Sequence, residues 1–245
     1  MSKINLLFDN ITEKDKTGAI RSLIDDSTPR PSFFFLVIMS GLMAACGLLI
    51  NNTSIVIASM LIAPILSPIL SLSLGVVTAD HKLISRSSIT LLKSIGFVIG
   101  FSALITWLLW SFTSGDNFST NLNPEIISRI KPSLVYLLVA IIAGIATSFA
   151  KVKPELSATL PGTAIAVALV PPLATVGIGI ATFRLDVISG ALGMFLLNII
   201  GIVAAAILMF SLMNIYNKKN VIIDSVEKAD QELKEKIKQA EKSKE

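Results

Sequence analysis

The residues of this chain whose type and position most clearly suggest a chemical role are prolines near the middle of two long apolar runs. Pro64 and Pro68 interrupt one run, and Pro171 and Pro172 interrupt another. Proline removes a backbone donor and clashes with the carbonyl four residues before it, so each run is expected to kink or to split into two half-helices. The amide groups that begin a second half-helix carry the positive end of the helix dipole, which attracts anions or polar oxygens.

Hydroxyl side chains accompany both interruptions. Ser67 directly precedes Pro68, which is the order of an N-cap and a first helical residue, so a half-helix is expected to start there. Pro172 is expected to open the second half-helix in the same way, with Thr175 as the nearest hydroxyl. The alternative is that the prolines only kink their helices, which membrane helices tolerate when neighbours satisfy the freed backbone. Two interruptions at corresponding positions favour a functional role.

Three asparagines are further candidates for a binding site. Asn51 and Asn52 directly precede the first interrupted run, where they either satisfy the backbone groups of a tight turn or line the outer mouth of a pathway. Asn198 lies deep in the last apolar run. A buried amide in lipid must find partners, so Asn198 either ties two helices together or touches a permeant species.

The groups that are missing from the apolar runs narrow the chemistry. No Asp or Glu lies in the central part of any run, so a carboxylate proton relay or carboxylate-bound sodium has no obvious carrier. No His/Asp/Glu or Ser/His constellation falls there either, so we expect no enzyme, no catalytic residue, no metal site and no cofactor. A site made of amides, hydroxyls and free carbonyls suits an anion, a small neutral solute or passive flow.

The elements that must position these residues are membrane helices. The chain is 53% hydrophobic and only 16% charged, with a mean hydropathy of +0.74, which indicates an integral membrane protein. Six apolar runs are long enough to span a bilayer, at residues 32–50, 53–77, 87–112, 133–150, 162–182 and 187–212. Small residues three or four apart, as at Gly96 and Gly100, allow neighbouring helices to approach closely. The expected fold is an all-α, polytopic bundle of six transmembrane helices.

The distribution of charge predicts three parts and an orientation. Residues 1–31 are a cytoplasmic amphipathic lead-in, 32–213 the membrane domain, and 214–245 a charged cytoplasmic helix or tail. Counting lysine and arginine outside the runs gives 17 on the side of the termini against 3 on the other, which favours cytoplasmic termini in the inner (plasma) membrane. If the two interrupted runs were re-entrant hairpins, the tally would be 15 against 5, so six crossings are preferred.

The two halves of the membrane domain share one plan. Each has a crossing rich in small residues, then a proline-interrupted crossing, then a longer crossing. Because three crossings per half is an odd number, the halves must have opposite orientations, as in the inverted repeats of many secondary transporters.

Four stretches carry a resemblance to a known family. They are INNTSIVIASMLIAPILSPILSLSLG, NPEIISRIKPSLVYLLVAIIAG, AIAVALVPPLATVGIGIA and GALGMFLLNIIGIVAA. In this order they resemble the uncharacterised hydrophobic-domain family of bacterial and archaeal membrane proteins, a numbered domain of unknown function, over about residues 32–213. The resemblance implies a membrane location and six helices. It implies no activity, so no functional residue carries over from it.

The function predicted from the sequence is a channel or transporter for a small anionic or neutral solute, with its site between the two interrupted helices. The alternative is a non-transporting membrane scaffold or stress component whose charged tails hold its partners. The lipid bilayer is the expected partner, and no basic-aromatic stripe of the nucleic-acid kind appears. A thin apolar stripe in the tail suits a short coiled coil, so a homo-oligomer is possible.

Overall fold

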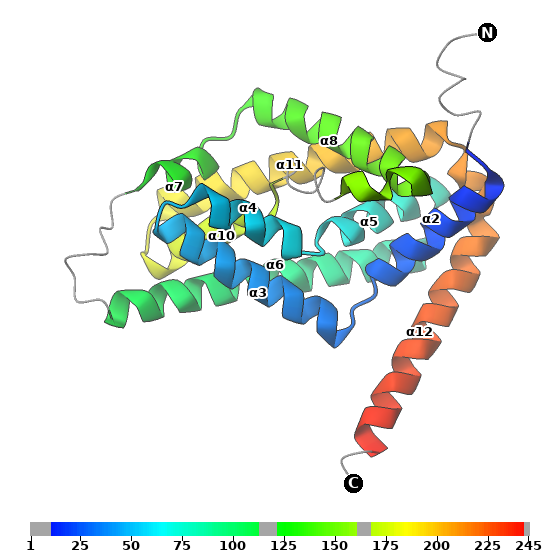
Figure 1. Cartoon of the computed structure of the whole chain (residues 1–245), viewed down its shortest axis with the longest axis horizontal. Coiled ribbons are helices and arrows are strands. Elements are labelled where there is room, and N and C mark those ends of the chain that lie inside the picture. Colours follow the sequence, from blue (N-terminus) through cyan, green and yellow to red (C-terminus); the bar gives the residue numbers. More distant parts are fainter. Residues whose placement is uncertain (1–10, 113–121, 161–167, 243–245) are drawn as a thin grey trace.

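A computed structural model describes residues 11–112, 122–160 and 168–242 of the chain, and these residues form helices joined by short turns (Figure 1). The helices are α2 (Glu13–Asp26), α3 (Pro31–Leu49), α4 (Thr53–Ile62), α5 (Leu66–Thr78), α6 (His81–Phe112), α7 (Pro124–Arg129), α8 (Leu134–Val152), η1 (Pro154–Thr159), α10 (Val170–Ala181), α11 (Leu185–Leu212), η2 (Ile215–Lys218) and α12 (Lys219–Lys242).

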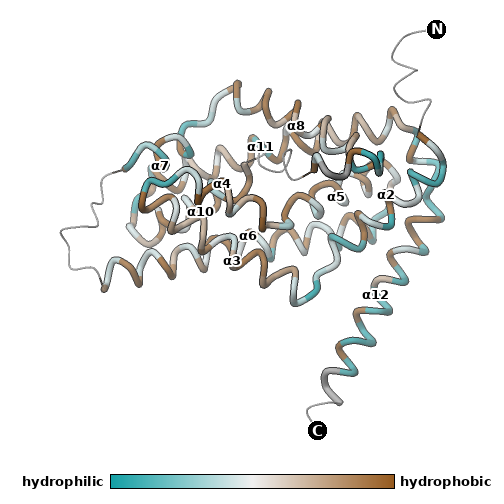
Figure 2. The backbone as a smooth tube through the Cα atoms, viewed as in Figure 1, coloured by the Kyte–Doolittle hydropathy of each residue, from teal (hydrophilic) through white to brown (hydrophobic). Residues whose placement is uncertain are grey.

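Four helices of the described ranges, α3, α6, α8 and α11, are long and apolar enough to cross a membrane. Helices α4 and α5 supply a fifth span if the bent pair is one crossing, and α10 is a shorter apolar helix. Figure 2 shows apolar residues along the whole bundle and polar residues at its two ends and on α12. The structure therefore supports a helical membrane bundle. The first part of the fifth expected run, residues 162–167, lies outside the described residues.

Glycine allows the closest helix contacts inside the bundle. A Cβ atom on Gly177 of α10 would lie 2.6 Å from the Ile99 carbonyl oxygen of α6, so only glycine fits there. A Cβ on Gly144 of α8 would lie 2.8 Å from the Cβ of Ala205 on α11. In lipid, which is as apolar as the side chains, the hydrophobic effect does not drive helices together. Close packing at these glycines therefore contributes to holding the helices together. Gly96 behaves differently from the expectation, because no described atom lies within 4 Å of a Cβ placed on it.

The amphipathic helix α2 covers one end of the bundle, beside η2 and the start of α12 (Figure 1). The side chain of Thr12 accepts from the Asp15 amide and the Asp15 carboxylate accepts from the Thr12 amide, so these two residues form a capping box at the start of α2. The apolar face of α2 is buried, and the Ser71 hydroxyl of α5 donates to the Leu23 carbonyl at 3.0 Å. This helix is therefore fixed to the membrane bundle.

Candidate permeation site

The first interruption separates α4 from α5 at residues 63–65, and the two helices are bent by 50°. Ala63 is extended, with φ −74° and ψ 118°, as expected for a residue before proline. Pro64 therefore ends α4.

The second half-helix of this run starts earlier than the sequence suggested. Helix α5 begins at Leu66, its N-cap is Ile65, and no side chain caps it. The expectation that Ser67 is the N-cap and Pro68 the first helical residue is wrong, because they are the second and third residues of α5. Proline is tolerated at that position because its amide would have no intrahelical partner.

The second interrupted run is described only from residue 168 onward, and the start of its helix resembles the start of α5. Helix α10 begins at Val170, so Pro172 is its third residue rather than its first, and this expectation is also corrected. In both α5 and α10 the N-cap is an apolar residue in the right-handed helical region, Ile65 or Leu169. One difference matters for binding: Pro171 takes the second position of α10, so α10 begins with fewer backbone donors than α5.

Two polar residues near the second interruption are used by the protein itself. The Thr175 hydroxyl donates to the Pro171 carbonyl at 2.9 Å, within α10. The Asn198 side chain is buried, and its Nδ2 lies 3.4 Å from the carbonyl oxygen of Ala168. Ala168 has φ 44°, a strained value for an alanine. Asn198 therefore ties α11 to the segment that leads into α10, which is the first of its two expected roles.

The asparagine pair lies at the other end of the molecule from α2, on the exposed turn between α3 and α4. Asn51 has φ 55°, which asparagine tolerates, and its Oδ1 accepts from the Glu125 amide at 3.3 Å. The Asn52 side chain accepts from the Ile55 amide at 3.2 Å and caps α4. Both side chains thus satisfy backbone groups of the turn and of α7.

The structure divides the predicted site residues among three places: the α3–α4 turn, the α4–α5 joint and the start of α10. Helices α6 and α11 connect the last two places, since each packs against both α5 and α10. Apolar side chains with at most 2% exposure surround both starts, including Ile65, Ile69, Leu70 and Leu173. Among the described residues, both helix starts are therefore packed against apolar side chains.

A buried line of hydroxyls on α6 was missed by the sequence interpretation. It consists of Ser87, Thr90, Ser94, Ser102 and Thr106, which are each at most 2% exposed. Their spacing of three, four, eight and four residues places them on one face of the helix, and this spacing is the signal that could have identified them.

The hydrogen bonds of this line decide what it offers a solute. Thr90, Ser94 and Thr106 donate to carbonyls of the preceding turn of α6, at 2.7–3.0 Å. Ser102 donates to the Gly41 carbonyl of α3 at 3.1 Å. A hydroxyl that donates in this way keeps its lone pairs, so these four oxygens can still accept.

A cavity of ≈ 520 Å³ opens at the α2 end of the bundle, between α2, the end of α8 and residues 154–160. Lys14 and Lys151 contribute to its lining, and the Lys151 ammonium pairs with the Asp26 carboxylate at 2.7 Å. Leu160, the last described residue before the segment that leads into α10, also lines it. Among the described residues, no three His, Cys, Asp or Glu side chains gather as metal ligands would.

Comparison with known proteins adds a family but no activity. The sequence profile of "Domain of unknown function (DUF389)" matches residues 60–204, which include both interruptions and Asn198 but neither Asn51 nor Asn52. The chain is 37% identical over 177 residues to "Uncharacterized protein MJ0678" of Methanocaldococcus jannaschii, which covers 72% of this chain and 52% of that protein. The chain thus spans about half the length of this relative. No solved structure matches.

Proposed function

This chain belongs to the DUF389 family, and we propose that it is a membrane channel or transporter that passes a small anionic or neutral solute between its two interrupted helices. The observation that carries the proposal is the shared start of α5 and α10, each inside the apolar bundle with a proline at its third position. Helix starts at membrane depth are tolerated only where protein or a wet cavity satisfies them, so a matched pair supports a common role in transport.

The directions of the two half-helices support the architecture of a transporter. Helix α5 runs from its joint toward the end covered by α2, whereas α10 runs toward the end that carries α7 (Figure 1). In our proposal the chain makes six crossings as two inverted repeats, with α5 and α10 in equivalent positions. Opposed half-helices of this kind allow a site to open alternately to each side.

Two features support the proposed solute classes. The hydroxyl oxygens of α6 suit a neutral solute that donates hydrogen bonds, and the amides of Leu66 and Ser67 at the start of α5 suit an anion. The end with α2 and α12 is proposed to be cytoplasmic, since most of the lysines and arginines outside the runs lie there.

Flux in reconstituted liposomes tests the proposal. The full chain is assayed with a panel of small anions and neutral polar solutes against empty vesicles. A flux for at least one solute is expected. No flux above empty vesicles for every member of the panel would contradict the proposal and favour a non-transporting scaffold. A chain ending at residue 217 further distinguishes a transporter from a scaffold. A transporter is expected to keep its flux in liposomes, whereas a scaffold is expected to lose its partners in a pull-down.

A further inference from the structure

The two halves of α12 differ in charge and in surroundings. Residues 219–232 carry two lysines and four acidic residues, and their apolar side chains Ile222, Val226 and Ala229 are buried. Residues 233–242 carry four lysines and two glutamates, and Ile237 is 50% exposed. Figure 1 shows this second half extending beyond the edge of the bundle. The acidic half is thus docked, and the basic half is free of the bundle.

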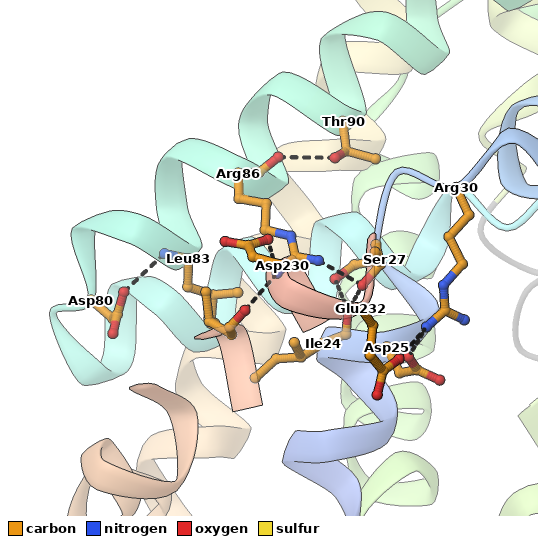
Figure 3. Close-up of polar contacts among 12 residues, drawn as sticks. Ile24, Asp25, Ser27, Arg30, Asp80, Leu83, Arg86, Thr90, Asp230 and Glu232 are labelled. Carbon is orange, nitrogen blue, oxygen red and sulfur yellow. Dashed lines mark hydrogen bonds and ion pairs between the residues drawn. The ribbon is translucent and has the colours of Figure 1, made fainter. Parts of the chain in front are cut away.

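Ion pairs fix which face of α12 is turned toward the bundle. The Arg86 guanidinium of α6 lies 3.0 Å from the Asp230 carboxylate (Figure 3). It also lies 3.4 Å from the Val226 carbonyl oxygen. Glu232 lies 3.8 Å from Arg30, directly before α3. The face of α12 that carries Val226 and Asp230 is therefore turned toward the bundle, whose helices α3 and α6 are long and apolar enough to span a bilayer.

The same face continues past the bundle. Leu233 and Ile237 follow Val226 and Asp230 by seven residues, which is two helical turns and returns to the same side. At 100° per residue, Lys234 and Lys236 lie on either side of this apolar pair, and Glu235 lies on the opposite face. An apolar stripe flanked by lysines is the pattern of a helix that lies in a membrane interface.

We propose that residues 233–242 lie on the surface of the bilayer, with Leu233 and Ile237 inserted among the headgroups and with Lys234 and Lys236 on anionic lipid phosphates. This inference rests on the proposed cytoplasmic position of the α2 end, since anionic lipids are concentrated in the cytoplasmic leaflet. A second copy of the chain is a poorer occupant, because only two apolar stripe positions with described side chains lie outside the docked half and a coiled coil needs several heptads.

Spin labels on the full chain test this placement. In a Cys46→Ser background, one label is attached at Ile237→Cys and a control label at Glu235→Cys. Each protein is placed singly in nanodiscs of phosphatidylcholine, with or without phosphatidylglycerol. We expect the label at 237 to lose access to a water-soluble nickel reagent and gain access to oxygen in the anionic discs, while the label at 235 stays in water.

Charge reversal supplies the second arm of the test. Lys234→Glu with Lys236→Glu should return the label at 237 to water, with an expected loss of membrane partition of about fivefold per lysine removed. Equal water access at 237 and 235 in both lipids would overturn the inference. In a parallel set of discs that hold two copies of the chain, protection of the label at 237 that is absent from the single-copy discs and accompanied by spin–spin coupling would also overturn the inference. Neither readout depends on flux, so a failed transport assay leaves this test intact.

Discussion

Asn198 shows how a single side chain joins two elements of the bundle. Its Nδ2 contacts the carbonyl of Ala168, a residue held at a positive φ directly before α10. We predict that Asn198→Ala lowers the free energy of unfolding by about 1 kcal/mol, the usual worth of an interhelical hydrogen bond in a membrane protein. Thermal unfolding in detergent measures it, with Asn220→Ala on the exposed start of α12 as the control. Equal melting temperatures for the two variants would contradict a stabilising role of the hydrogen bond between Asn198 and Ala168.

Glycine at position 177 is required for a different reason, the distance between backbones. A Cβ there would lie 2.6 Å from the Ile99 carbonyl oxygen and 2.9 Å from the Ala103 amide, and neither backbone group can rotate away. Gly177→Ala is therefore expected to lower stability by about 1–3 kcal/mol, as overpacking does. Gly96→Ala is the matched control, because it meets no described atom within 4 Å and should be neutral or stabilising by up to about 1 kcal/mol. The opposite ranking in a melting assay would contradict the α6–α10 contact.

Glu13 gives the attachment of α2 a dependence on pH. Its carboxylate accepts from Lys218 of η2 and from Lys16, and these bonds, the Lys218 bond first, lower its pKa to about 2. Because this folded pKa lies below the unfolded value of about 4.3, the contact stabilises above pH 4.3 and is lost as pH falls toward 2. The effect is small, since the carboxylate is exposed. The melting difference between wild type and Glu13→Gln should shrink from about pH 6 to about pH 3; a constant difference would exclude this contribution.

At the scale of elements, the joint between α4 and α5 separates the roles of two nearby prolines. Pro64 ends α4, whereas Pro68 sits where its missing amide costs no intrahelical bond. Pro64→Ala is predicted to reduce the 50° bend and to abolish most of any liposome flux, because the two helices could then join. Pro68→Ala is the matched control and should keep flux near wild type. Loss of flux in Pro68→Ala alone would show that the proline ring, rather than the joint, matters.

The boundaries of single elements show where sequence patterns were sufficient. The expected run 32–50 matches α3 at Pro31–Leu49, and 187–212 matches α11 at Leu185–Leu212. Helix α6 begins at His81, six residues before the expected apolar run 87–112, so residues 81–86 form a polar first part of the same helix. The start of α5 could not be predicted from Ser67, because it depends on where the chain returns to helical geometry after Pro64 ends α4.

At the scale of the whole molecule, most charged side chains lie at the two ends of the bundle rather than in its middle. Ion pairs join α2, α6, α8 and α12 at one end, including Lys82–Glu227 at 3.6 Å and Lys151–Asp26 at 2.7 Å. Between the ends, the buried polar side chains of the described residues are hydroxyls and the amide of Asn198, whereas Lys93 of α6 is exposed. A pathway through it would therefore select solutes by size and hydrogen bonding more than by charge.

Composition and hydrophobic runs alone determined that this chain is a helical membrane protein, and the position of Pro64 predicted the break between α4 and α5. The family was indicated by the resemblance of four sequence stretches and is shown by the profile match. These properties follow from the residues themselves, because backbone in lipid must satisfy its own hydrogen bonds as helix, and a proline in the middle of an apolar run, as at Pro64, ends or kinks that helix. Only the tertiary structure decided that Asn198 and Asn52 serve the backbone, that hydroxyls line α6, and that α12 leaves the bundle halfway along its length. Those outcomes depend on which helices pack against one another, and a local sequence pattern does not specify those tertiary contacts.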